Sequence, residues 1–153
     1  MSEPATSAPS DPDAAAPPIR IGVRAVFSRT ITQSDITLYA GITGDFAPHH
    51  INAEFGRSTR FGTTIAHGLF TASLVDGAVA ALLPHGSVSV RRTLTFTAPV
   101  RPGDTITAVA EVTQVDDAAR TLTLATTCTN QRGGVVVTGT AAERLPLSIP
   151  SSP

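Results

Sequence analysis

This sequence of 153 residues contains no lysine and no tryptophan, and its only cysteine is Cys128. Every basic residue is an arginine, which excludes lysine Schiff bases, lysine general bases and the lysine-containing phosphate-binding loop. A single cysteine also excludes an intrachain disulfide and Cys-x-x-Cys metal or redox motifs. Because Cys128 lies in an alternating apolar run, we expect it to be a buried structural thiol.

Long apolar runs are missing as well. No window reaches the ~18 apolar residues that a membrane-spanning helix needs. The acidic, proline-rich N-terminus does not resemble a signal peptide, which starts with a basic segment followed by an apolar one. A formal net charge of -1 gives no electrostatic reason to expect nucleic acid or an anionic membrane. We therefore expect a cytoplasmic protein without nucleic-acid or membrane partners.

Both ends of the chain are poor in residues that can form a core. Residues 1–18 are rich in proline and alanine and have no large aliphatic or aromatic side chain beyond Met1, which predicts a disordered tail. Residues 146–153 are similar, and we expect a flexible C-terminal tail there. The remaining residues, 19–145, suit one domain with a sizeable core.

The first part of this domain reads as a strand followed by helices. A weak alternation predicts a strand over 19–29, and Thr32 with Asp35 forms a capping box at the start of a helix. The apolar face expected for that helix consists of Ile36, Leu38, Tyr39 and Ile42. A loop is predicted over 45–50 and a short helical piece over 53–58. A helix over 68–83 is apolar nearly all round, which predicts burial on most sides.

The second part is rich in Val, Thr, Leu and Ile, punctuated by turn residues, and predicts a run of antiparallel strands. These strands are expected over 87–97, 105–115, 121–129 and 135–143. One strand, a long buried helix and four further strands predict an α+β fold, in which a curved antiparallel sheet wraps around a central helix.

Asp45 and His50 are the first candidates for chemistry, because a proline-containing turn separates them by five residues. A carboxylate and an imidazole held together can orient a water molecule and exchange protons with it. The alternative is an Asp–His hydrogen bond that only ties a loop.

His67-Gly68 opens the long helix, where free N–H groups can stabilise a developing enolate oxygen. The alternative there is that Gly68 only permits a tight entry into a packed helix.

Other polar residues have weaker signals. His49, His50 and His67 could supply metal ligands, but adjacent histidines rarely reach one ion, and we expect no metal. His85 is expected in a solvated turn. Asp76, inside the apolar helix, needs either a hydrogen-bond partner or a polar pocket. The pair Arg91-Arg92 is expected at a solvated strand edge, with a phosphate-bearing substrate arm as the alternative.

Taken together, several stretches resemble the MaoC-like dehydratases of the hot-dog superfamily, especially the single-domain (R)-specific enoyl-CoA hydratases. The resemblance covers about residues 25–145. The matching stretches, in order, are YAGITGDF at 39–46 with Pro48 and His50, Phe55, IAHGL at 65–69, FTAPVRPGD at 96–104 and VTGTA at 137–141.

The resemblance implies a hot-dog fold, usually dimeric, and so a homodimer without cofactor or metal. It implies that Asp45 and His50 hold the water that adds to C3 of a trans-2-enoyl thioester of CoA or acyl carrier protein. The N–H of Gly68 would bind the thioester oxygen. We further expect His67, Phe46 and Asp76 at the substrate.

This sequence departs from the family pattern at three positions. Ala47 stands where the hydratases usually carry Asn, and His49 stands where an aliphatic residue is usual. At the position of Asp76 a small or hydroxyl side chain is expected. Two alternative functions stay open: a hot-dog acyl thioesterase, and a non-catalytic partner subunit of a heteromeric dehydratase.

Overall fold

A computed structural model describes residues 19–147 as five strands and four helices. The predicted tail 1–18 lies outside the described residues, as do residues 148–153 of the predicted C-terminal tail. The elements are β1 (Arg24–Thr30), α1 (Gln33–Thr43), α2 (Pro48–Ile51), α3 (Ala53–Ser58), α4 (Gly68–Leu82), β2 (Val88–Phe96), β3 (Thr105–Asp116), β4 (Thr121–Asn130) and β5 (Val135–Arg144).

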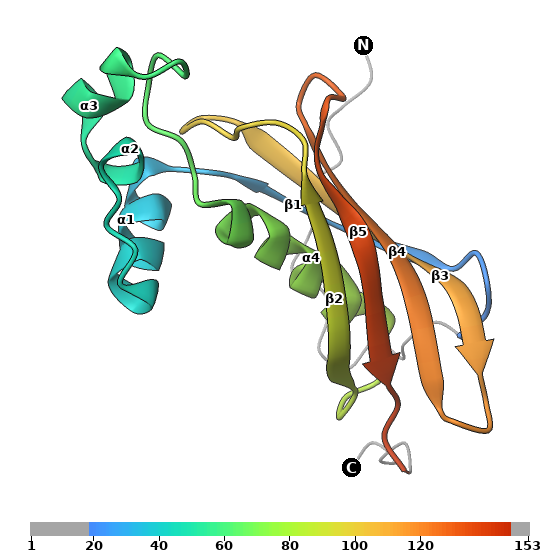
Figure 1. Cartoon of the computed structure of the whole chain (residues 1–153). Helices are drawn as coiled ribbons and strands as arrows, with labels where there is room; N and C mark the ends of the chain where they lie inside the picture. The colour runs from blue at the N-terminus through green and yellow to red at the C-terminus, as the bar shows by residue number, and fades with distance from the viewer. Residues whose placement is uncertain (1–18, 148–153) are drawn as a thin grey trace.

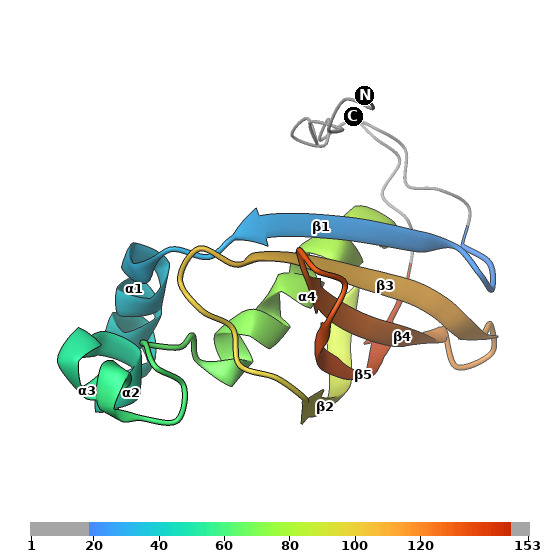
Figure 2. The same cartoon turned by 90° about the horizontal axis from the view of Figure 1, so that it is seen from above.

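The strands form one antiparallel sheet in the order β1-β3-β4-β5-β2, so β1 and β2 are the edges. The sheet curves around α4, while α1, α2 and α3 gather beyond the N-terminal end of that helix (Figures 1 and 2). This arrangement confirms the predicted α+β architecture of a curved sheet around a central helix. The four later strands begin and end within one residue of the predicted bounds.

The core lies between α4 and the concave face of the sheet. Alternating residues of β3 and β4, such as Ile106, Ala108, Leu122 and Leu124, are fully or almost fully buried against the helix. The buried residues of α4 are Thr71, Ala72, Leu74, Val75, Ala78, Val79 and Leu82. Its contacts are mostly with β1, β3 and β4.

The capping box predicted for α1 is present. The Thr32 hydroxyl accepts the N–H of Asp35, and the Asp35 carboxylate accepts the N–H of Thr32 at 2.9 Å. Half of the predicted apolar face of this helix is confirmed, because Ile36 is buried and Tyr39 is half-buried. The other half is wrong, because Leu38 and Ile42 are exposed and Ala40, one turn after Ile36, is the second buried residue.

The first strand starts five residues later than predicted. Residues 20–23 form a turn in which the Val23 N–H donates to the Arg20 carbonyl, and Gly22 adopts a φ of +88°. That left-handed conformation cannot continue a strand. Arg24 is therefore the first residue of β1, paired with Glu111 of β3.

The sequence-based expectations for Cys128 and His85 are both confirmed. Cys128 is fully buried, and burial raises the pKa of its thiol to about 11. His85 lies in the exposed turn after α4. Among the described residues, no helix is long and apolar enough to cross a membrane.

Candidate active site

The end of α1 positions Asp45. Gly44 closes the helix with a φ of +77°, and its N–H donates to the Ala40 carbonyl at 2.8 Å. This left-handed cap is the conformation that favours glycine at a helix end. The chain then turns sharply, and one carboxylate oxygen of Asp45 accepts the N–H of Ala47 at 3.2 Å. The Asp45 side chain, 52% exposed, keeps its other oxygen free to face the site.

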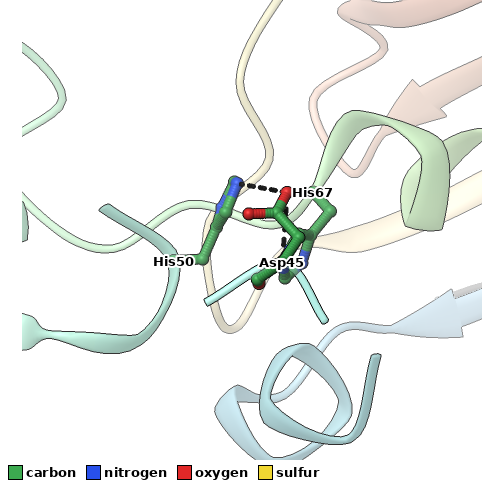
Figure 3. A group of neighbouring side chains, drawn as sticks. All are labelled: Asp45, His50 and His67. Carbon is green, nitrogen blue, oxygen red and sulfur yellow. Dashed lines mark hydrogen bonds and ion pairs between the residues drawn. The ribbon is translucent and has the colours of Figure 1, made fainter. Parts of the chain in front are cut away.

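His50 comes from α2, a single helical turn where a loop was predicted. Pro48 starts this turn, as suits a residue whose ring fixes φ and whose missing N–H is not needed there. The His50 Nδ1 lies 2.7 Å from the carbonyl oxygen of Ile65. Because a carbonyl can only accept, Nδ1 carries the proton. The other ring nitrogen, Nε2, then has a free lone pair and lies 3.9 Å from the Asp45 carboxylate (Figure 3).

The surroundings of His50 favour its neutral form. Burial lowers the pKa of His50 below the ordinary 6.5, and the neighbouring His67 and His49 lower it further. The hydrogen bond to Ile65 and the Asp45 carboxylate act in the opposite direction but do not outweigh burial. At neutral pH His50 therefore presents an unprotonated nitrogen to the site, which is the form that a general base requires.

His67 joins the other two residues from the N-cap position of α4. Its Nε2 donates to the backbone carbonyl of Asp45 at 2.9 Å, and its ring stacks on that of His50 with centroids 3.8 Å apart. The same ring lies 5.0 Å from the ring of Tyr39. His67 is 3% exposed, and its Nδ1 has no hydrogen-bond partner. The predicted contact of His67 with substrate stays a prediction.

Asp45, His50 and His67 each offer a ligand atom within 4.8 Å of the others. Their orientation does not suit a metal ion. The rings of His50 and His67 are inclined by only 27°, so their in-plane lone pairs run side by side instead of meeting at one ion. The His67 Nε2 is also occupied by the Asp45 carbonyl. His49 packs its ring against His50 at 4.0 Å and lies outside this group of ligand atoms.

Gly68 directly follows His67 as the first residue of α4, so its N–H belongs to the unpaired group at a helix start. A Cβ at this position would lie 3.0 Å from the Phe96 ring, so tight packing also favours glycine here. Phe46, next to Asp45, is 54% exposed. Asp76 is not brought to the Asp45–His50 pair; it lies two turns along α4 and forms an ion pair with Arg92 at 2.8 Å.

Gln33 was missed by sequence reasoning. Its side-chain amide donates to the backbone carbonyl of His50 at 2.9 Å and accepts the hydroxyl of Thr64 at 2.8 Å. It therefore links α1 to α2 and to the segment that supplies the Ile65 carbonyl. Within the sequence, Gln33 is only an inner residue of the capping box, and no local pattern signals this longer-range role.

Comparison with known proteins identifies the family of this chain. A family model described as the MaoC-like domain matches residues 15–132, which include Asp45, His50, His67 and Gly68. The chain belongs to the MaoC-like family. This confirms the resemblance inferred from the sequence, and the hot-dog architecture with it.

Individual relatives cover most of the chain. An (R)-specific enoyl-CoA hydratase from Rhodospirillum rubrum is 40% identical over 84% of this chain and 89% of its own length. A 3-hydroxybutyryl-CoA dehydratase from Methylorubrum extorquens is 38% identical over 84% of this chain and 82% of its own. A solved structure of an (R)-hydratase from A. caviae has a TM-score of 0.79 at 32% identity, covering 84% of this chain and 98% of that one.

Proposed function

We propose that this MaoC-like protein is a hydro-lyase that adds water to a trans-2-enoyl thioester to give an (R)-3-hydroxyacyl thioester, and catalyses the reverse dehydration. The observation that carries the proposal is the free Nε2 of His50 facing the Asp45 carboxylate at 3.9 Å. That separation is too long for a direct hydrogen bond but suits two groups that share one water. The names of the relatives supply the substrate class and the stereochemistry.

The tautomer of His50 suggests the order of proton transfers. Its Nε2 accepts a proton from the water while the water oxygen bonds to C3 of the enoyl thioester. Asp45 accepts the water's other hydrogen in a hydrogen bond and stabilises the imidazolium that forms. The imidazolium then returns its Nε2 proton to C2 on the same face. Water is thereby added as hydroxyl at C3 and hydrogen at C2, and His50 ends neutral.

The thioester oxygen gains negative charge as C3 is attacked, because electrons move from the double bond toward the carbonyl. We assign its stabilisation to the N–H of Gly68 at the positive end of the 15-residue helix α4. The exposed ring of Phe46 beside Asp45 is available to contact the substrate. His67 acts here as a positioning residue, since its ring is buried and holds the Asp45 carbonyl.

The test is hydration of a panel of enoyl thioesters carried by CoA and by acyl carrier protein, with crotonyl-CoA as the first substrate. Replacement of Asp45 by Asn or of His50 by Gln is expected to lower kcat by about 100- to 10,000-fold, because each removes one partner of the water. His85→Gln is the matched control, since His85 lies in an exposed turn. A wild-type protein that is inactive on the whole panel would refute the proposal.

The thioesterase alternative is distinguished by thiol release, since hydration leaves the thioester intact.

The partner-subunit alternative makes a different prediction about assembly. Strand β2 is a sheet edge with exposed Val88 and Val90, which suits pairing with a second copy. We propose a homodimer, measurable by light scattering of the protein expressed alone, whereas an obligate partner subunit would aggregate. The cytoplasmic location stays a prediction.

A further inference from the structure

The helix that carries His50 cannot fix its own position. α2 has four residues, and two backbone hydrogen bonds of 2.9 Å define its turn, from the N–H of His50 to Ala47 and from the N–H of Asn52 to Pro48. A single helical turn is not stable alone, because its first hydrogen bonds fix many backbone torsions for little gain. The place of the His50 ring therefore depends on the residues to which α2 is bonded.

The segment before α4 holds α2 from one side. The N–H of Ile65 donates to the His49 carbonyl at 3.0 Å, and the Ile65 carbonyl accepts the Nδ1–H of His50 at 2.7 Å. Both hydrogen bonds join α2 to this segment, and neither reaches α1, which lies beside α2 and carries Asp45 just beyond its end (Figures 1 and 2). The gap of 3.9 Å between His50 and Asp45 thus also depends on how α2 lies against α1.

The same segment is itself fixed in place. The N–H of Ala66 donates to the carbonyl of Val100 at 2.8 Å. From another side α3 packs so closely that a Cβ on Gly56 would lie 2.6 Å from backbone atoms of Thr63 and Thr64. The neighbouring Ile65 carbonyl is therefore a fixed acceptor, and α2 is the element that shifts if one of its other contacts is lost.

Gln33, the first residue of α1, supplies the missing connection. Its side-chain NH2 donates to the His50 carbonyl at 2.9 Å, and its amide oxygen accepts the hydroxyl of Thr64 at 2.8 Å. The carbonyl decides which way the amide points, because it can only accept. Thr64 is 4% exposed, so its hydroxyl needs this partner inside the protein. One side chain thus binds both the backbone of His50 and the residue next to Ile65.

We propose that Gln33 is a positioning residue for His50, and that its hydrogen bonds to His50 and Thr64 set the gap that holds the catalytic water. This inference rests on the proposed hydro-lyase function and adds a residue to its machinery. The hydrogen bonds of Gln33 go to the backbone of His50 and to Thr64, not to the His50 ring or the Asp45 carboxylate. Gln33 therefore acts through His50, and its loss should affect kcat more than KM.

The first measurement is steady-state hydration of crotonyl-CoA by Gln33→Met, which keeps the length of the side chain and removes the amide. A displacement of about 1 Å at a catalytic group costs up to about 100-fold in rate, so kcat should fall by about 10- to 100-fold. KM should change by less than about threefold, because the substrate is bound by other residues. Gln114→Met is the matched control, since Gln114 is exposed on β3 and should leave both constants unchanged.

The second measurement uses Thr64. Thr64→Val keeps the shape of the side chain and removes one of the two hydrogen bonds of Gln33, so kcat should fall by about 2- to 10-fold. Thr64→Ser retains a hydroxyl and should restore kcat close to the wild-type value. The double variant Gln33→Met, Thr64→Val should have the kcat of Gln33→Met alone, because both residues act through one hydrogen-bond network.

Circular dichroism and thermal melting establish which variants are folded at the assay temperature. The inference is overturned if folded Gln33→Met keeps the wild-type kcat, if the two single losses multiply in the double variant, or if Thr64→Ser loses as much activity as Thr64→Val. If Gln33→Met does not fold, the comparison of Thr64→Val with Thr64→Ser decides. A wild type that hydrates no enoyl thioester refutes the proposed function itself, whereas these results with an active wild type refute only the role of Gln33.

Discussion

Replacement of His67 by phenylalanine is predicted to lower kcat without lowering the stability of the fold. Phenylalanine keeps the volume and the stacking on the His50 ring but loses the Nε2–H bond to the Asp45 carbonyl. Loss of this hydrogen bond should lower the free energy of unfolding by about 0.5–1.5 kcal/mol. The same change removes the buried His67 Nδ1, which has no hydrogen-bond partner, and this should raise the free energy of unfolding by about 1–3 kcal/mol.

The free energy of unfolding should therefore change by between about −0.5 and +2.5 kcal/mol. The centre of this range, about +1 kcal/mol, corresponds to a Tm increase of about 2–4 °C. The Asp45 loop, in contrast, loses the bond that holds it, and a displacement of about 1 Å at a catalytic group costs up to about 100-fold in rate. We expect kcat for crotonyl-CoA, followed by loss of the conjugated enoyl absorbance, to fall by about 10- to 100-fold.

His67→Gln offers an amide N–H in place of the ring donor and should recover part of the lost rate. Two results would refute the reasoning about His67. The first is a wild-type kcat for the phenylalanine variant. The second is a Tm that falls in proportion to the activity, which would mean that the change acts through general destabilisation.

Three further predictions follow from the same contacts. The acid limb of kcat/KM should have its midpoint below pH 6.5, because burial lowers the His50 pKa and activity needs the neutral ring; a midpoint above 6.5 in a pH–rate profile would contradict this. The free energy of unfolding should decrease as pH falls below about 6.5, since the unfolded chain binds the His50 proton more tightly, which urea titrations at several pH values can measure. Arg92→Met should lower the free energy of unfolding by about 3 kcal/mol, because it leaves the buried Glu143 carboxylate without its ion-pair partner. Asp76→Ala should lower it by less than about 1 kcal/mol, because Asp76 is exposed. Equal losses for the two variants in denaturant titrations would argue against a buried Arg92–Glu143 pair.

The fold was predictable where local chemistry decides it. The capping box of Thr32 and Asp35, the turn residues between the later strands and the alternation around Cys128 each specify structure within a few residues. The burial of α1 was not predictable, because whether Leu38 faces a neighbour depends on how far the helix stands from the sheet.

The site was predictable as a motif but not as a geometry. Asp45 and His50 are close in sequence, so spacing alone suggested a pair. The tautomer of His50 depends on the Ile65 carbonyl, 15 residues away, and the stacking of His67 on His50 depends on the entry into α4. The ion pair between Arg92 and Glu143 needs the register of β2 against β5, which one sequence does not reveal.

The most direct test of the proposed chemistry is hydration of crotonyl-CoA in deuterated water, with chiral and NMR analysis of the product. The proposed function predicts (R)-3-hydroxybutyryl-CoA as the product, and the return of the proton by His50 to the face of attack predicts syn addition. The product then carries deuterium at C2 on the face that received the hydroxyl. An (S) product, deuterium on the opposite face, or free CoA thiol in place of a hydroxyacyl thioester would contradict the account.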